Sequence, residues 1–414
     1  MRKLKNDALE MVLDTHSHDI TNRVVPYYNR WSSQYVLLNK FSFYTKPVIT
    51  PLTRTLFGNG LGFLREQDWT RHNKIISPAF NIDKLKVIGR EMATCTISLL
   101  EEWENQIFTS KDQCKTMEMK GEFKRLSADI LAHATFGSSY MEGEEAFKAQ
   151  TQIQDHCAAS KTEMFIPRSQ YLPTPSNIRI WKLDRIVKNT IRNIIEGRMN
   201  AEAIESSDGY GDDILGLMIG ASTMIQSRSD LKLKMNEIIE ECKSFFFAGN
   251  ETTSVSLTWT LFLLCEISSQ HGFAGAMRLY GPSLQLVREA SKDVKLGKIT
   301  IPKGTGIIIP SIKIHRSKKY WEEDAEVFNP LRFVNGISQA AKNPHALLVF
   351  GLGPRVCLGQ TFAMLQAKIA MALILQKFSF SLSPEYKHTP MSFLSLQPQF
   401  GLFVIIKCFG NSIA

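Results

Sequence analysis

Residues 350–359, FGLGPRVCLG, hold one cysteine between glycines, beside an arginine, at the start of an apolar run. The run from Gln360 to Lys377 has apolar residues at helical spacing and no Pro or Gly, which predicts a helix. Cys357 would then lie where backbone N–H groups are free and the helix dipole is positive. Both features favour a thiolate over a thiol. Gly353 and Gly359 would let the backbone fold closely around the sulfur.

This stretch resembles the ligand loop of the cytochrome P450 family, F-x-x-G-x-R-x-C-x-G. The fixed positions are filled by Phe350, Gly353, Arg355, Cys357 and Gly359. The resemblance implies that Cys357 is the axial thiolate ligand of a haem b iron and that Phe350, Arg355 and Gly359 bind the cofactor. The alternative is a buried structural cysteine after a Gly-Pro turn. A dinucleotide-binding loop is excluded, because Val356 stands where its third glycine would be.

The composition is that of a globular protein. The chain has 414 residues, of which 44% are hydrophobic and 21% charged, and no linker or repeat divides it, so one domain over residues 1–414 is expected. Seven scattered cysteines without a C-x-x-C pair indicate a reducing compartment. The net charge of +9 suits an acidic protein partner, an anionic membrane surface or a solvated basic face. No basic stripe alternates with aromatic residues, so a nucleic-acid partner is not expected.

The first residues, MRKLKND, are polar and lead into no apolar run, so neither a signal peptide nor a transmembrane segment is expected. The family resemblance implies a location at the cytosolic face of the endoplasmic reticulum membrane. Relatives from eukaryotes begin with a membrane anchor, and we expect that anchor to be absent here.

The order of predicted elements is rich in helix, with small sheets late in the chain. Helical spacing covers residues 85–103, 123–136, 178–199 and 231–266. A hairpin is predicted over 294–304, with a further strand at 307–309, and a second hairpin joins 393–396 to 402–406. The expected fold class is mainly α with small β-sheets (α+β). The order agrees with an incomplete cytochrome P450 fold, which the chain resembles most clearly over residues 52–407.

The predicted helix over residues 231–266 contains the polar segment AGNETT at 248–253. Thr252 can donate a hydrogen bond to the carbonyl of Ala248 and loosen the helix, and Gly249 would let a flat cofactor approach the backbone. Glu251 can organise water for proton transfer. The segment resembles the family's oxygen-binding motif, which implies catalytic roles for Glu251 and Thr252. The alternative is a kinked core helix with satisfied polar groups.

Further matches support the resemblance. FNPLRF at 328–333 resembles the family's meander, in which Arg332 would brace the cysteine loop. Arg278 to Pro282 and then Val287 to Ala290 resemble the end of the helix that meets this meander, and Arg288 would face a haem propionate. DWTRHNK at 68–74 resembles the propionate-binding helix, with Trp69 and His72 in pattern.

Three features depart from the family pattern. Gly275 stands where a glutamate should pair with Arg278 and Arg332, and two buried cations without their shared partner are expensive. The distance from Thr252 to Arg278 is too short for the two further helices and the loop that the family has there, so an internal deletion is expected near residues 265–278. Asn73 replaces an arginine, a loss that Arg71 or Lys74 could partly offset. We interpret the chain as a truncated or mis-spliced family member.

The resemblance implies a haem-dependent monooxygenase that hydroxylates a small apolar molecule with O2 and electrons from NADPH, passed on by a flavoprotein reductase. Substrate-pocket candidates include Phe246, Phe247 and Ala248. The local sequence around residues 278–290 and 395–402 is most similar to that of plant members that oxidise gibberellin-type diterpenoids or related hormones. Two alternatives are an inactive relative with impaired haem binding and a helical interaction scaffold with a structural cysteine.

Overall fold

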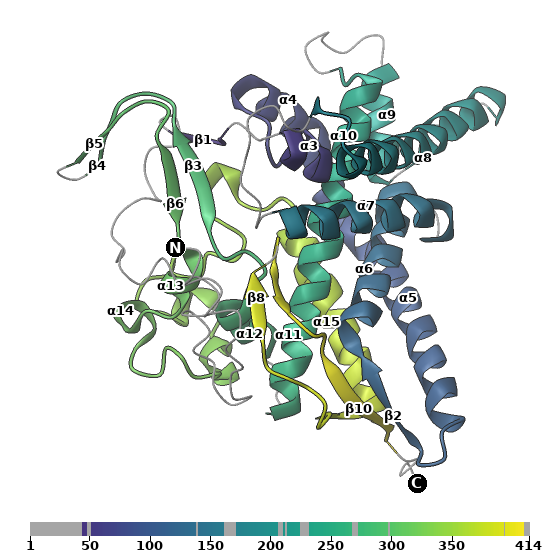
Figure 1. The fold of residues 1–414 in the computed structure, drawn as a ribbon, viewed down its shortest axis with the longest axis vertical. Helices are drawn as coiled ribbons and strands as arrows, with labels where there is room; N and C mark the ends of the chain where they lie inside the picture. The colour runs from purple at the N-terminus through teal and green to yellow at the C-terminus, as the bar shows by residue number, and fades with distance from the viewer. Residues whose placement is uncertain are drawn as a thin grey trace. The chain divides into compact units, whose positions relative to one another are not determined.

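A computed structural model describes residues 44–47, 51–137, 140–160, 171–205, 210–211, 213–223, 232–266, 272–296, 299–392 and 394–409. Helices predominate and the strands form small antiparallel sheets, which confirms the predicted fold class (Figure 1). The chain forms two compact units, each assembled from separate segments. The first unit takes its described residues from Met1–Thr45, Met92–Leu126 and Thr252–Ala414, and the second from Lys46–Glu91 and Ser127–Glu251.

The second unit is helical. It contains α3 (Pro51–Phe57), α4 (Glu66–Ile76), η3 (Ser77–Phe80), α7 (Tyr140–Ser160), α8 (Pro175–Glu205), α9 (Ile214–Thr223), α10 (Met235–Phe245) and η6 (Phe246–Glu251). The helices α7 and α8 pack along each other. The ring of Phe246 lies against those of Phe136 and Phe147, with centroids 5.3 Å and 4.3 Å away. Three buried aromatic rings therefore anchor the end of α10 in the core of this unit.

The first unit carries the sheets. The strand β10 (Phe403–Cys408) lies between β2 (Cys114–Glu118) and β7 (Phe378–Leu382). A second sheet has the order β1 (Tyr44–Thr45), β3 (Leu286–Ala290), β6 (Gly306–Ile309). Two-stranded ladders join β4 (Val294–Leu296) to β5 (Ile299–Ile301) and β8 (Pro390–Ser392) to β9 (Leu396–Pro398). The remaining helical elements of this unit are α11 (Thr252–Glu266), α12 (Gly272–Tyr280), α13 (Ser311–His315), α14 (Lys318–Trp321), η7 (Pro330–Phe333), η8 (Ile337–Gln339), η9 (Gly353–Arg355) and α15 (Gln360–Lys377).

Two long helices, α5 (Ile82–Phe108) and α6 (Met119–Phe136), contribute residues to both units. They extend the predicted helices 85–103 and 123–136, and α8 likewise contains 178–199. The helix α15 has the predicted bounds, and the 294–304 hairpin is present as β4 and β5. Among the described residues, no helix combines the length and the apolar character needed to cross a bilayer. The N-terminal stretch and the junction at 267–271 lie outside the described residues.

Two predictions about strands are wrong. Residues 396–398 and 403–408 do not form one hairpin, because β9 pairs with β8 whereas β10 pairs with β2 and β7. The central place of β10 buries Val404 and Ile406 completely, which a hairpin alone would not do. Residues 287–290 belong to the strand β3 and not to a helix end, since Gly281 and Pro282 stop α12 at Tyr280.

Candidate active site

The cysteine loop turns tightly before α15. Gly351 and Gly353 have φ angles of 74° and 78°, in the region that favours glycine. The N–H of Cys357 donates to the carbonyl of Phe350 at 2.8 Å, which closes the loop. Gly359 has an ordinary φ of −82°, so the expectation that its dihedrals require glycine is wrong. The loop thus presents Cys357, which is exposed, three residues before the first residue of α15.

The expected preference of Cys357 for the thiolate is not found in the protein alone. Desolvation by surrounding protein atoms raises the pKa of its thiol, and a hydrogen bond from the Gly359 backbone lowers it only in part. Cys357 as a whole residue is nevertheless exposed. A poorly hydrated thiol in an exposed loop is suited to a ligand that fixes the thiolate itself, since a coordinating metal deprotonates a thiol outright.

Two arginines of the first unit lie close to each other. Arg288, on β3, is 5% exposed, and its Nη1 donates to the carbonyl of Val287 at 2.9 Å. Desolvation, followed by the charge of Arg288, holds the pKa of Arg355 down at about 10. Two partly buried cations that repel each other form a natural site for a dianion. The structure therefore brings Arg288 and Arg355 together, on a strand and on η9.

The segment that carries Glu251 and Thr252 is a distorted helix. The α-helix α10 changes at Phe246 into a π-helix that ends at Glu251, and α11 begins at Thr252. The helix is therefore irregular here, in the form of a π-helical turn, a feature that often marks functional sites. The hydrogen bond from Thr252 to the carbonyl of Ala248 stays a prediction. Glu251 is 3% exposed, and the carbonyl of Thr252 accepts a hydrogen bond from Ser256 at 2.8 Å.

The expected role of Gly249 is wrong. A Cβ at this position would lie 2.8 Å from Cδ1 of Leu131 on α6, so the missing side chain permits close helix packing and not the approach of a cofactor. Ala248 is exposed instead, and Phe247 is half-buried with its ring 4.2 Å from that of Phe57. Phe246 is buried at 1% exposure, so its place in the core argues against a pocket role.

The helix α4 places Trp69 and His72 in the second unit. Trp69 is half-buried, and His72 is 1% exposed with its Nδ1 at 2.6 Å from the Glu241 carboxylate. The Nε2 of His72 has no hydrogen-bond partner in the part of the chain that the structure describes, and Glu237 Oε1 lies 3.6 Å away. The carboxylate of Glu241 also accepts the N–H of Leu61 at 3.0 Å. This buried pair was not predicted, because its members are far apart in sequence and no motif contains both.

Arg71 is already paired. Its guanidinium binds Glu237 at 2.5 Å and donates to the carbonyl of Lys232 at 2.6 Å. The hydrogen bond from Arg71, together with a backbone hydrogen bond from Lys234, outweighs desolvation and lowers the pKa of Glu237 to about 2. Arg71 is therefore not available to replace the arginine missing at Asn73, whereas Lys74 is exposed.

Arg278 and Arg332 lack the family's shared glutamate but have other partners. Arg278 is 1% exposed and donates to the carbonyls of His315 and Val327 at 2.9 Å and 2.8 Å, and to that of Ala325. Arg332 forms an ion pair with Asp324. Backbone carbonyls and a neighbouring carboxylate therefore take the place of the shared glutamate in part.

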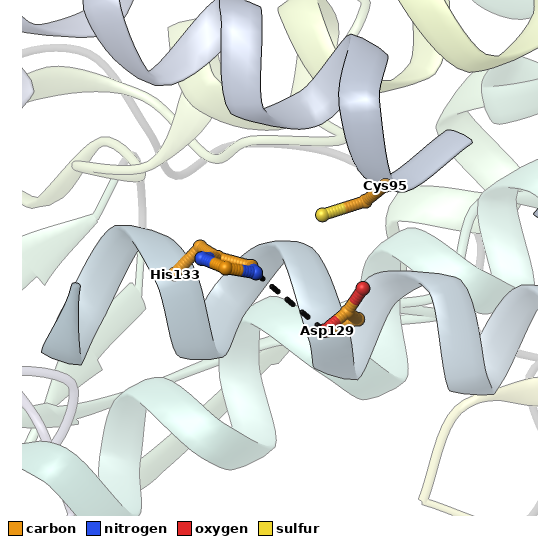
Figure 2. A group of neighbouring side chains, drawn as sticks. All are labelled: Cys95, Asp129 and His133. Carbon is orange, nitrogen blue, oxygen red and sulfur yellow. Dashed lines mark ion pairs between the residues drawn. The ribbon is translucent and has the colours of Figure 1, made fainter. Parts of the chain in front are cut away.

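Asp129 and His133, one turn apart on α6, approach to 3.9 Å (Figure 2). Cys95, also drawn there, belongs to the other unit. A histidine and a carboxylate alone provide too few ligands for a structural zinc ion, which takes four. We therefore assign no metal site to this pair.

Comparison with known proteins identifies the family. The sequence profile described as "Cytochrome P450" matches residues 20–267 and 276–403. Cytochrome P450 709B3 of Arabidopsis thaliana is 42% identical over 99% of this chain and 89% of its own length. Secologanin synthase 1 of Catharanthus roseus is 37% identical over 87% and 74%, and Cytochrome P450 734A1 of Arabidopsis thaliana is 33% identical over 95% and 85%.

The fold agrees with this assignment. A solved structure described as the crystal structure of cytochrome P450DA heme domain has a TM-score of 0.72 and covers 87% of this chain and 83% of that chain, at 21% identity. The chain belongs to the cytochrome P450 family, whose members are monooxygenases that use a haem b iron, electrons from a reductase and small-molecule substrates.

Proposed function

We propose that this protein hydroxylates a small apolar molecule of the terpenoid or hormone-like kind, using O2 and electrons that a flavoprotein reductase takes from NADPH. The observation that carries the proposal is the exposed Cys357 of the first unit, in the same unit as the neighbouring cations Arg288 and Arg355. A thiolate ligand and two guanidinium groups suit a haem, which has an iron centre and two propionates. A relative named for the small product it forms, secologanin synthase 1, supports a small organic substrate.

The residues have distinct roles in this proposal. Cys357 would hold the iron, with Phe350 and Gly359 shaping the loop, and Arg288 and Arg355 would pair with the propionates. When bound, the haem supplies the activation of oxygen. We further propose that Trp69 and His72 bind the cofactor, as the family resemblance implies.

Glu251 and Thr252 would hold and pass protons at the end of the π-helix. Ala248 and Phe247, on the accessible side of the same segment, would contact the substrate.

The proposed location is the cytosolic face of the endoplasmic reticulum membrane. The net charge of +9 would add electrostatic attraction to this membrane surface. We also propose that residues 1–414 act as one domain.

The test of this function is incorporation of labelled oxygen. The purified chain is supplied with haem, a plant reductase, NADPH, ¹⁸O₂ and a panel of diterpenoids and related hormones, and products are analysed by mass. One labelled oxygen atom in a product, lost in Cys357→Ala and kept in Cys408→Ala, supports the proposal. Cys408 is a half-buried cysteine of β10 outside the loop and serves as the matched control. Haem binding without any labelled product would contradict it.

A second candidate is an inactive family member, and specific observations favour it. The profile match is interrupted between residues 267 and 276. The alignment to Cytochrome P450 709B3 runs over 464 positions, although the chain has only 414 residues, so at least 50 positions have no counterpart here. Gly275 lies within the interrupted segment. Failure to retain haem after purification would support this candidate, and sequencing the transcript across residues 265–278 would show whether the junction is encoded.

A further inference from the structure

Three arginines of the first unit lie near one another, and two of them contact Trp321. Arg278 is 1% exposed and Arg316 5% exposed, and the side chain of Arg332 is 9% exposed. The guanidinium of Arg278 lies over the indole ring, 5.1 Å from its centroid, and Arg332 donates to the carbonyl of Trp321 at 3.1 Å. Three cations are thus held in a small, largely dehydrated volume, where charge is expensive unless it is balanced.

The carboxylates near these arginines do not balance them. Arg316 pairs with Glu326 and Arg332 with Asp324, and each of these carboxylate side chains is 41% exposed. Arg278 has only backbone carbonyls as partners among the contacts described. Repulsion from Arg332 and Arg316 adds to desolvation, and together they hold the pKa of Arg278 down at about 9. One positive charge of the three is left without a matching negative charge.

His315 does not compensate for this excess. Its Nε2 accepts the N–H of Leu348 at 2.8 Å, which requires a neutral ring at that nitrogen. Burial, together with the charges of Arg278 and Arg316, lowers its pKa to about 3. The histidine therefore adds no charge of either sign at neutral pH.

The guanidinium groups of the cluster keep unpaired donors. Within the described residues, these include the buried Nε atoms of Arg278 and Arg332, which have no hydrogen-bond partner. A buried N–H of a charged group without an acceptor is strongly unfavourable, because the hydrogen bonds it made to water are not replaced. The Nε edge of a guanidinium is the edge that a planar carboxylate binds with two parallel hydrogen bonds.

No residue of α12 supplies a carboxylate to the Nε atoms of Arg278 and Arg332. Gly275 precedes Arg278 by three residues, on the same face of the helix, and has no side chain. The ring of Phe328 covers it, 2.8 Å from the position of an added Cβ. The negative charge that would balance Arg278 must therefore come from elsewhere.

We propose that the Nε edges of Arg278 and Arg332 bind a small carboxylate anion from solution, of the size of formate or acetate. A single monovalent anion matches the single uncompensated charge. A carboxylate fits better than a halide, because it offers one acceptor to the Nε of Arg278 and another to the Nε of Arg332. The partly exposed carboxylates of Asp324 and Glu326, which pair with Arg332 and Arg316, place the cluster near the protein surface.

Thermal unfolding of the full-length protein tests this site. Formate, acetate, gluconate or chloride is titrated at constant ionic strength, and the melting temperature is recorded. We expect a saturable rise with formate and acetate, because a ligand that binds only the folded state stabilises it by mass action. Gluconate, a bulky carboxylate, should give none. An equal saturable rise with chloride would overturn the carboxylate assignment, and a rise that is linear and equal for formate and gluconate would overturn the site.

Variants locate the effect. Arg332→Gln should lose the saturable rise, whereas Arg125→Gln should keep it, since Arg125 is an exposed arginine paired with Glu102 and Glu122. The double variant Gly275→Glu with Phe328→Ala supplies an internal carboxylate and should also lose the response. If Arg332→Gln does not fold, saturation-transfer NMR with ¹³C-formate on the unaltered protein decides: transfer supports the site, and its absence overturns it. None of these readouts requires haem, so the site can fail while the proposed function holds.

Discussion

The imidazole of His72 and the carboxylate of Glu241 meet at 2.6 Å inside the second unit, with side chains 2% and 0% exposed. The same carboxylate accepts the N–H of Leu61. Glu241 therefore joins three parts of this unit: α4, α10 and the turn between α3 and α4. A buried carboxylate with these partners stabilises the fold. When the Nδ1 of His72 donates to it, the carboxylate also fixes the tautomer of that ring.

Removing that carboxylate should destabilise the protein strongly. We expect Glu241→Ala to lower the free energy of unfolding by about 3–5 kcal/mol, because it leaves His72 and a backbone N–H without partners in the core. The matched control is the neighbouring Glu240→Ala, whose partly exposed carboxylate accepts the N–H of Asn59 at 2.8 Å. The control should lose only about 1 kcal/mol. Equal losses in urea denaturation would contradict this account of Glu241.

Restoring the family glutamate should not restore stability. In Gly275→Glu the new Cβ would meet the ring of Phe328 at 2.8 Å, so we expect a loss of about 1–3 kcal/mol from overpacking. The double variant with Phe328→Ala removes the clash and brings a carboxylate toward Arg278, so it should be more stable than the sum of the two single changes predicts. Chemical denaturation of the four proteins checks this cycle. If the single variant Gly275→Glu were more stable than the unaltered protein, the Phe328 ring would have moved aside at little cost, and the expected overpacking would be contradicted.

Acid should destabilise the protein through His315. Its pKa is about 3 in the folded protein and about 6.5 when unfolded, so below pH 6.5 the unfolded chain binds a proton that the folded protein does not. Stability is therefore full above pH 6.5 and falls as the pH drops from 6.5 toward 3, by up to about 1.4 kcal/mol per pH unit. His315→Gln keeps an acceptor for the Leu348 N–H and should flatten this slope between pH 6.5 and 5. Urea midpoints at several pH values measure the slope of stability against pH in both proteins. Equal slopes in His315→Gln and the unaltered protein would contradict the role given to His315.

Neutralising Arg288 should have opposite effects with and without haem. Arg288→Gln removes repulsion from Arg355, so the haem-free protein should be as stable as the unaltered one or more stable. It also removes one partner of an anion, so haem should transfer to an acceptor protein at least about tenfold faster. Arg179→Gln, at an exposed position on α8, changes the charge equally and should alter neither quantity. Unchanged haem transfer in Arg288→Gln would exclude a propionate contact.

The sequence predicted the features that depend on neighbouring residues. The bounds of α15 follow from an apolar period without Pro or Gly, and the 294–304 hairpin follows from alternation around a Gly-Lys turn. The loop from Phe350 to Gly359 was recognisable because its spacing is local. The family and the fold class rested on such local signals and are confirmed.

Features that depend on distant partners were missed. The pairing of β10 with β2 joins residues nearly 300 positions apart, and nothing local distinguishes it from a hairpin. The Glu241 partner of His72 and the Leu131 partner of Gly249 are likewise set by tertiary packing. The pKa of Cys357 was misjudged because the helix terminus was visible in the sequence whereas the desolvation was not.

The most direct test of the central claim, that Cys357 ligates a haem iron as a thiolate, is the Soret spectrum of the reduced protein with carbon monoxide. The chain is expressed with haem supply, purified, reduced and exposed to the gas, beside Cys357→His and Cys408→Ala. The account predicts the red-shifted band of a thiolate-ligated haem in the unaltered chain and in Cys408→Ala, and its loss in Cys357→His. A chain that retains haem without that band, or a band that survives in Cys357→His, would contradict it.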